Sequence, residues 1–203
     1  MKKKDFTGIV PAQYTGKEIK AASSTQLSDD NHAKIFYTEA SHRLLRVNEW
    51  HHIAGAITAH FQLIDANGQE VKREAQKSDY IRIDIPGPGS KKGDGYDWVY
   101  IEELIELAED NVQSIGFRVR PSQNPFSNEN ETAHFYSGES TSTFIITREG
   151  EKVSAIIFDR NIKPNEDTSS VKDKIRHAGV GGIAMGIFSK LQWKNLARGL
   201  IRR

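Results

Sequence analysis

The sequence contains no cysteine, which excludes disulfide bonds, zinc sites built on cysteine and catalysis by a thiol. It also lacks a long hydrophobic run, because the longest nearly apolar stretch, residues 178–188, is about half of the ~20 residues that span a bilayer. Residues 5–16, which follow the basic start of the chain, hold no apolar segment typical of a secretory signal. We therefore expect a cytoplasmic protein.

An excess of charge of one sign is also missing, since 28 Lys and Arg residues balance 27 Asp and Glu residues. A dedicated nucleic-acid-binding protein usually has a strongly basic face, so we do not expect a nucleic-acid partner. The charge is nevertheless uneven, because residues 168–203 hold eight basic residues and one acid. Contact of this basic tail with an anionic membrane surface is an alternative that we rank below packing on protein.

Alternation of apolar and polar residues predicts strands through the middle of the chain. Turn signals at Asn67-Gly68 and Glu149-Gly150 favour hairpins, because these pairs supply the positive φ values of tight turns. The acidic second half of residues 98–107 is also compatible with a helix. The stretches with the strand pattern are 57–63, 69–75, 80–85, 98–107, 114–120, 140–148 and 152–158.

We predict a mainly β fold, an antiparallel β-barrel or sandwich of about seven strands with an N-terminal arm and a C-terminal helical segment, α+β overall. Residues 1–42 form the arm, which is partly irregular and is compatible with a short helix near residues 31–40, capped by Asp29 or Asp30. Residues 43–165 form the β domain. Residues 166–203 form a basic, glycine-containing helical tail that packs on the domain or on a second subunit, so we expect a homo-oligomer.

The long loops between the expected strands indicate where a site would lie. If successive strands run antiparallel, the Asn67-Gly68 turn, the loops 86–97 and 121–137 and the exit at 159–164 share one end. Long loops on a rigid sheet commonly carry binding residues. The candidate ligand-binding residues at this end are Lys91, Lys92, Asp94, Tyr96, Asp97, His134, Tyr136, Asp159 and Arg160.

Three other motifs carry weaker signals. His51 and His52 are adjacent and point apart on either a strand or a helix, so we expect neither a metal site nor a bound cofactor. Ser137-Gly138-Glu139-Ser140 does not match the Gly-x-Ser-x-Gly pattern of hydrolase nucleophiles. Arginines on the outward phase of the strands share their faces with acids, which favours cross-strand ion pairs over nucleic-acid binding.

Three functions remain open. The first is a non-enzymatic β-barrel module that binds a small ligand or a peptide at the loop end and self-associates through its tail. The second is a hydrolase or metal-dependent enzyme with Asp94, Asp97, His134 and Asp159 as acid–base or metal residues. The third is an assembly or scaffold protein without a pocket.

Overall fold

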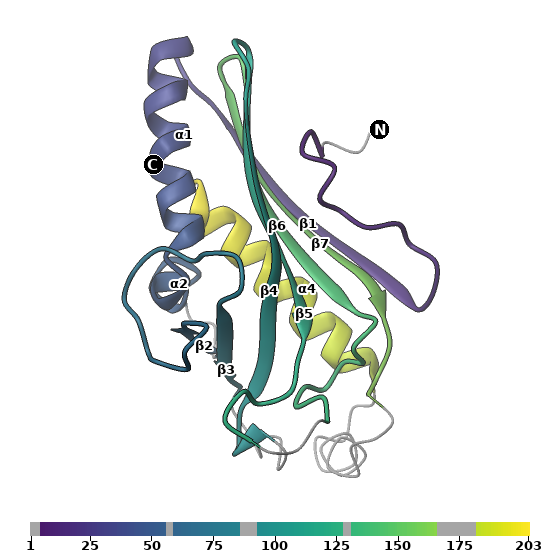
Figure 1. Ribbon diagram of the computed structural model, residues 1–203. Coiled ribbons are helices and arrows are strands. Elements are labelled where there is room, and N and C mark those ends of the chain that lie inside the picture. Colours follow the sequence, from purple (N-terminus) through teal and green to yellow (C-terminus); the bar gives the residue numbers. More distant parts are fainter. Residues whose placement is uncertain (1–4, 56–58, 86–92, 128–130, 166–181) are drawn as a thin grey trace.

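The structure is a computed structural model that describes residues 5–55, 59–85, 93–127, 131–165 and 182–203, with side chains in the last segment from Lys190 onward. Figure 1 shows a curved sheet with helices against it. In chain order the elements are β1 (Lys17–Gln26), α1 (Asp30–Leu45), the 3-10 helix η1 (Val47–Glu49), α2 (Trp50–Ile53), β2 (His60–Ile64), β3 (Tyr80–Asp84), β4 (Asp97–Ala108), β5 (Val112–Pro121), β6 (Thr141–Glu149), β7 (Lys152–Ile162) and α4 (Gly182–Leu200).

The seven strands form one antiparallel sheet in the order β1-β7-β6-β5-β4-β3-β2. A register shift between Ile101 and Glu103 interrupts the pairing of β4 with β5, and such irregularities bend a sheet. The expected class, a mainly antiparallel β protein with a C-terminal helix, is confirmed. The strands form a single curved sheet, with β1 and β2 as its edges, rather than two facing sheets.

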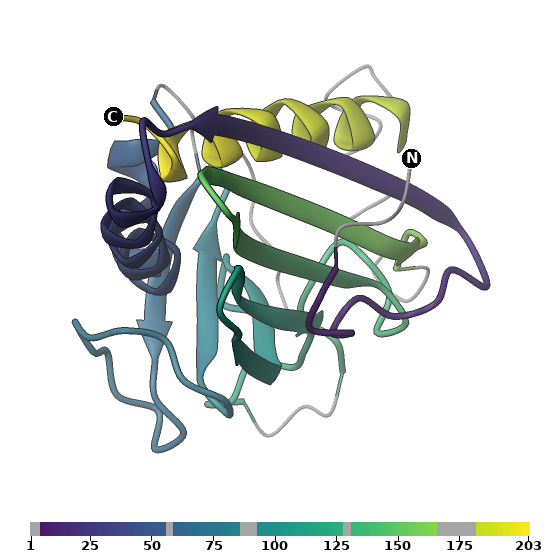
Figure 2. The same cartoon turned by 90° about the horizontal axis from the view of Figure 1, so that it is seen from above.

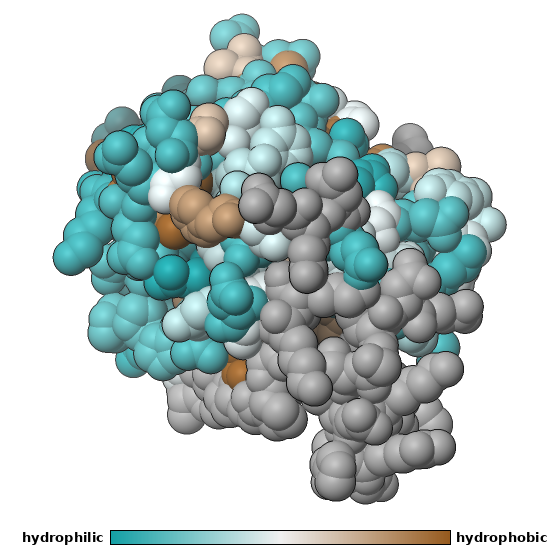
Figure 3. All heavy atoms as spheres, turned by 60° about the horizontal axis from the view of Figure 1, so that its bottom comes forward, coloured by the Kyte–Doolittle hydropathy of each residue, from teal (hydrophilic) through white to brown (hydrophobic). Residues whose placement is uncertain are grey.

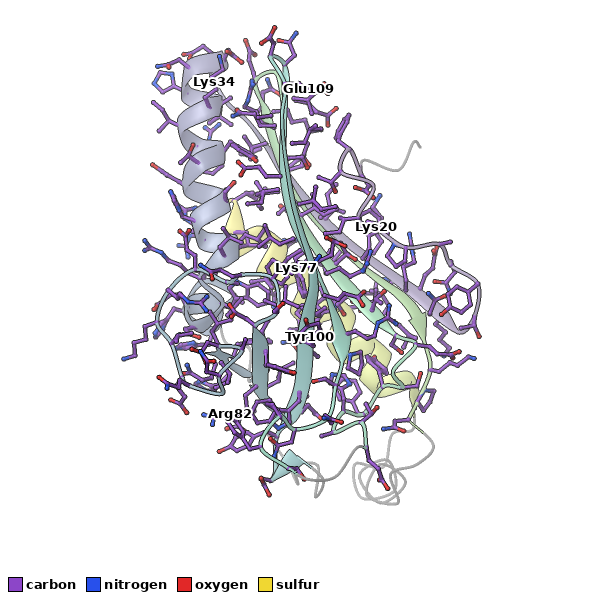
Figure 4. The ribbon with its side chains drawn as sticks, viewed as in Figure 1. Lys20, Lys34, Lys77, Arg82, Tyr100 and Glu109 are labelled. Atoms are coloured by element: carbon purple, nitrogen blue, oxygen red, sulfur yellow. The ribbon has the colours of Figure 1, made fainter. Side chains whose placement is uncertain are left out.

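Strand pairing divides the sheet into two ends. The pairs Ile83 with Asp97 and Val119 with Ser142 place the connections 85–96 and 122–140 at one end, which we call the loop end. The β4–β5 and β6–β7 connections are tight and lie at the opposite, hairpin end. Figure 4 labels Glu109 at the hairpin end and Arg82 toward the loop end.

Helix α1 covers one face of the sheet at the hairpin end. The side chain of Asp29 accepts a hydrogen bond from the backbone N–H of His32 (2.9 Å), which caps the helix at its start. Ala33, Phe36 and Ala40 recur at helical spacing, are buried and belong to the main hydrophobic core. The helix therefore packs its apolar stripe on β6 and β7.

Helix α4 lies alongside β1 and covers the same face of the sheet (Figures 1 and 2). Leu196, Ala197 and Leu200 are at most 1% exposed and join the main core. Of the two packings that we expected for the tail, the described part of α4 shows the one on its own domain. Self-association through this segment stays a prediction.

The opposite face of the sheet carries the N-terminal arm. Ile9 is 1% exposed and packs with Ile145, Ile156 and Phe158 on the outer side of β6 and β7. The side chain of Asn161 accepts hydrogen bonds from the backbone N–H groups of Tyr14 (2.9 Å) and Thr15 (3.2 Å). These contacts hold the arm across the sheet.

Several expected elements differ from the structure. Residues 17–26, which we placed in an irregular arm, form the edge strand β1, and the helix expected near residues 31–40 extends over Asp30–Leu45. Residues 69–75 form no strand and make a single bridge, from Ile64 to Glu70. Residues 98–107, by contrast, remain a strand throughout.

The turn at Asn67-Gly68 was assigned to the wrong end of the sheet. Because residues 69–75 are not a strand, this turn follows β2 at the end where Tyr80 begins β3, away from the 85–96 connection. The turn nevertheless touches the long loop, since a Cβ on Gly68 would lie 2.5 Å from the ring of Phe126. The tail start expected near Ser169 or Ser170 lies outside the described residues.

Candidate functional site

A cavity lies between the sheet and α4 near the loop end. Its volume is about 60 Å³, enough for a few waters or one small organic group. Figure 3 looks toward this end, where the described surface is mainly hydrophilic. The described residues that line the cavity are Trp50, Phe61, Ile81, Ile83, Ile85, Val99, Val119, His134, Phe135, Tyr136, Ser142, Phe144, Asp159, Gln192 and Trp193.

Aromatic side chains form much of the apolar wall. The ring of Phe144 lies between Trp50 (4.9 Å between centroids) and Trp193 (5.1 Å, edge to face), and Trp50 also contacts Phe61 (5.3 Å). The indole N–H of Trp50 donates to the carbonyl of Leu44 (3.1 Å), which fixes the ring. These contacts join α2, β2, β6 and α4 into one aromatic wall.

Asp159 on β7 is the acidic group of the cavity among the described residues. Its side chain points to the helix-covered face, where one carboxylate oxygen accepts the hydroxyl of Ser142 (2.7 Å) and the other accepts the indole N–H of Trp193 (2.9 Å). Asp159 is 1% exposed. The carboxylate therefore joins β6, β7 and α4 at the place where the helix meets the sheet.

Burial controls the ionisation of this carboxyl group. It raises the pKa of Asp159 from 3.8 to about 6, because a charge is poorly solvated away from water, although the Ser142 and Trp193 hydrogen bonds and the nearby Arg160 oppose the rise. At neutral pH most of the Asp159 side chains are charged, and in mild acid most are neutral. The cavity thus contains a negative charge that a ligand cation can neutralise.

The second polar side chain comes from the loop between β5 and β6. His134 is 5% exposed, and its Nδ1 accepts the backbone N–H of Tyr136 (2.9 Å), so the neutral ring carries its proton on Nε2. The side-chain amide of Asn165 donates to the carbonyls of Thr132 (3.2 Å) and His134 (3.1 Å). The chain that follows β7 therefore holds this loop against the cavity.

A smaller void of about 20 Å³ adjoins the polar end. It shares Val99, Val119, His134, Tyr136, Ser142 and Asp159 with the main cavity. Thr141 also lines it and is 2% exposed, and its hydroxyl oxygen has no hydrogen-bond partner among the described residues. A hydroxyl of this kind is ready to bond a water or a ligand.

The structure brings three of the predicted site residues together. His134, Tyr136 and Asp159 all line the main cavity. Asp97 is buried and starts β4 at the loop end, paired with Ile83. These positions are consistent with the reasoning from loop length, whereas the role of the residues stays a prediction.

The other predicted residues lie elsewhere. Arg160 points to the opposite face of β7 from Asp159 and donates to Glu18 (2.5 Å). Asp94 accepts a hydrogen bond from the side chain of Asn124 (2.9 Å). The ring of Tyr96 lies under the guanidinium of Arg82 (4.7 Å), also away from the cavity. Lys91 and Lys92 lie outside the described residues.

The sequence analysis missed most of the cavity wall, including Trp193 and Gln192 of α4. Trp193 lies three residues before Leu196 and seven before Leu200, so a helix places all three on one side, but this spacing does not indicate a cavity. Ser142 and Phe144 likewise share one face of β6. Which segment covers that face depends on the tertiary packing of α4.

The described part of the chain holds no group of three or more His, Cys, Asp or Glu side chains arranged to bind a metal ion. His51 does lie close to His52 (3.7 Å between ring centroids) and to His60 (4.9 Å). No helix there is both long and apolar enough to cross a membrane.

No protein-family model matches this chain, and no curated protein matches it in sequence. Among solved structures, a hypothetical protein of Helicobacter pylori shares 9% identity over 90% of this chain and 87% of its own, with a TM-score of 0.46. A truncated norcoclaurine synthase of Thalictrum flavum shares 7% identity over 91% of this chain and 96% of its own, with a TM-score of 0.33. A major latex-like protein of Panax ginseng shares 13% identity over 86% of this chain and 97% of its own, also with a TM-score of 0.33. At these values the matches carry no argument about function.

Proposed function

We propose that this protein binds a small molecule in the cavity between α4 and the sheet, and that the ligand has an apolar body and a protonated amine. One observation carries the proposal: a carboxylate, Asp159, is buried in a cavity with otherwise largely apolar walls. Small-molecule sites combine apolar walls with a few placed polar groups in this way. Of the two ligand classes that we expected, a cavity of only about 60 Å³ favours a small molecule over a peptide.

Cavity size limits the ligand. About 60 Å³, with an adjoining void of about 20 Å³, is far below the roughly 300–1,000 Å³ of sites for drug-sized molecules. A short aliphatic amine meets this limit without opening the fold. Larger ligands require the loop at 131–140 or α4 to move outward.

Charge determines which small ligand is preferred. Burying the Asp159 carboxylate costs free energy, and an ammonium group next to it offsets that cost in a way that a neutral or anionic group does not. His134 lines the same end of the cavity and, when neutral, carries its proton on Nε2, so it adds no negative charge there. We therefore expect an amine to bind more tightly than the alcohol or the carboxylic acid with the same carbon chain.

The test is an NMR titration of the full chain with n-butylamine, butanol and butyrate. The chain has three tryptophans, and the indole N–H signals of Trp50 and Trp193 report on the cavity, whereas Trp98, which donates to Gly93, packs on the other face of the sheet as an internal control. We expect n-butylamine to shift the two cavity signals at the lowest concentration. Equal shifts at Trp98, or no shift in any signal, contradict the proposal.

The variant Asp159→Asn separates the charge from the shape of the cavity. It keeps the size of the side chain and removes its charge, so the preference for the amine over butanol should disappear while butanol still binds. The matched control is Asp84→Asn, at an exposed position of β3, which should leave the preference unchanged. If Asp159→Asn retains the preference, another group recognises the amine.

An enzyme that moves protons is the second candidate, favoured by the raised pKa of Asp159 beside His134. A carboxyl group whose pKa is about 6 can accept and return a proton near neutral pH. Deuterium exchange at the carbon next to the carbonyl of butanone, in the presence of the protein, tests this activity. Exchange that Asp159→Asn abolishes supports an enzyme, and exchange no faster than in buffer leaves binding as the function.

A further inference from the structure

A second hollow lies at the far end of α4, where the last turns of the helix meet α2 and the edge strand β1. Its volume is about 470 Å³, it is open to solvent, and it shares no described lining residue with the cavity. Apolar side chains of Ile53 and Ile201 contribute to its lining. The polar residues of its lining include Arg198, Arg202, Arg203, His52, Ser23 and Thr25.

The walls of this hollow are held by close packing. A Cβ on Gly199 would lie 2.0 Å from the carbonyl oxygen of Ile53, so glycine is what lets α4 contact the end of α2. On the other side, Arg203 donates to the backbone carbonyl of Gln26 in β1. The hollow is therefore a surface feature formed by α4, α2 and β1, which are in direct contact.

The charged side chains that line the hollow are all basic. No acidic side chain is among the described residues that line it, and within the described chain Arg198, Arg202 and Arg203 make no ion pair with an Asp or Glu side chain. Several other arginines do have an acidic partner, for example Arg73 with Asp79 (2.7 Å) and Arg148 with Asp30 (2.5 Å). Three guanidinium groups gathered without an acid repel one another and attract an anion.

Basic residues are common at the end of a helix because they bond its last carbonyls and interact with its dipole. Here another residue makes those bonds. The guanidinium of Arg43 on α1 donates to the carbonyls of Leu200 (3.3 Å) and Arg202 (2.6 Å). Arg198 and Arg202 are thus not needed to cap α4, and their side chains are available to the hollow.

We propose that this hollow binds a phosphate-bearing group. Guanidinium groups and hydroxyls donate the hydrogen bonds that phosphate oxygens accept, and guanidinium also carries the opposite charge. Arginine binds phosphate with two parallel hydrogen bonds. A volume of about 470 Å³ exceeds a lone phosphate and falls in the range of small-molecule sites, roughly 300–1,000 Å³. The phosphate belongs either to a soluble compound or to the headgroup of a lipid, and the two sources present the same chemistry.

The test uses the full chain and two kinds of probe. Inorganic pyrophosphate is titrated while the backbone amide signals of Ser23, Thr25, Gly55 and Gly199 are followed by NMR. Vesicles of phosphatidylcholine, with and without phosphatidic acid, are sedimented with the protein. Shifts at the hollow with pyrophosphate indicate a soluble ligand, and binding only to vesicles that contain phosphatidic acid indicates a lipid headgroup; either result supports the site.

A matched pair of double variants shows whether the hollow or the overall charge is responsible. Arg198→Gln with Arg202→Gln removes two charges from the hollow, whereas Lys190→Gln with Lys194→Gln removes two exposed charges from the same helix outside it. We expect the arginine variant to lose about tenfold in affinity, the effect of one charge-assisted hydrogen bond of roughly 1.4 kcal/mol. The lysine variant should stay within about twofold.

Two results overturn the proposal. One is that neither pyrophosphate nor acidic vesicles bind the native chain. The other is that both double variants weaken binding equally, which shows general attraction to a basic helix. Circular dichroism of each variant verifies that it is folded, and the amide shifts of the native chain locate the probe independently of the variants.

Discussion

The two ends of α4 take part in sites of opposite character. Toward the loop end, Trp193 and Gln192 close a small, largely buried cavity that contains the carboxylate of Asp159. At the other end, Arg198 and Arg202 border an open, basic hollow several times larger. One helix therefore separates an acidic group that is shielded from water from basic groups that water reaches.

The difference shows how burial determines what a charge does. In the cavity, desolvation raises the pKa of Asp159, so the charge depends on pH and on what lies beside it. In the hollow, the guanidinium groups of Arg198, Arg202 and Arg203 are exposed, so salt screens their charge. Substitutions at the cavity should therefore change stability, whereas those at the hollow should change mainly binding.

The largest expected effect is at the aromatic wall of the cavity. Phe144→Ala removes a ring that is 2% exposed and contacts Trp50 and Trp193, which should lower the free energy of unfolding by about 3–5 kcal/mol. Urea denaturation measures the change. Leu191→Ala, at a residue of α4 that is 57% exposed, is the control and should change it by less than about 0.5 kcal/mol.

The contact of α4 with α2 is the next largest. Gly199→Ala places a methyl group 2.0 Å from the carbonyl of Ile53, so the helix must shift, at a cost of about 1–3 kcal/mol. In Gly138→Ala the nearest atom to the new methyl group is 3.8 Å away, and thermal unfolding should show little change. Equal melting temperatures for the two variants would mean that the contact is looser than described.

The stability of the cavity end should depend on pH through Asp159. The folded state binds its proton more tightly than the unfolded chain, because the pKa is about 6 when folded and 3.8 otherwise, so stability falls as pH rises from about 4 to about 6. Asp159→Asn should remove this dependence and stabilise the protein by about 1–3 kcal/mol at pH 8. Unfolding by urea at a series of pH values checks both effects. If the native chain gains stability between pH 4 and pH 6 relative to Asp159→Asn, the raised pKa of Asp159 is wrong.

The smallest effect on stability is expected at the hollow. Arg198→Gln removes an exposed charge among like charges and should change the free energy of unfolding by less than about 0.5 kcal/mol. Arg148→Gln is the contrasting variant, because Arg148 is fully buried and donates to the carbonyls of Asp110 and Gly150. The substitution leaves these two carbonyls unpaired and should lower the free energy of unfolding by about 1–3 kcal/mol. A large loss for Arg198→Gln would show that its side chain stabilises the fold and is not available to a ligand.

The sequence was most informative where local pattern and structure agree. Alternation located β3, β5 and β6, and of the two caps expected for the helix near residues 31–40, Asp29 is the one that begins α1. The pattern failed at residues 17–26, where a polar, serine-rich stretch forms an edge strand because β7 supplies its hydrogen bonds. It failed again at 69–75, which makes a single bridge, from Glu70 to Ile64 of the edge strand β2, and then leaves the sheet.

The candidate site was partly predictable for a similar reason. Loop length directed attention to His134, Tyr136 and Asp159, which do line one cavity, but it also selected Arg160, whose side chain points to the other face because neighbours on a strand alternate. No local pattern indicated that Trp193 would meet Asp159, since 34 residues separate them. The basic composition of the tail was visible in the sequence, but its gathering into a hollow with β1 and α2 was not.

By itself the sequence determined the antiparallel class, the basic helical tail and the exclusion of cysteine chemistry, because composition and period act locally. Only the tertiary structure decided that the sheet is single and open, which face α4 covers, and which charges are buried. These depend on contacts between residues far apart in the chain, whose free energies outweigh local preference. The ionisation of Asp159 is the clearest case, since its pKa follows from burial under a helix that begins more than twenty residues later.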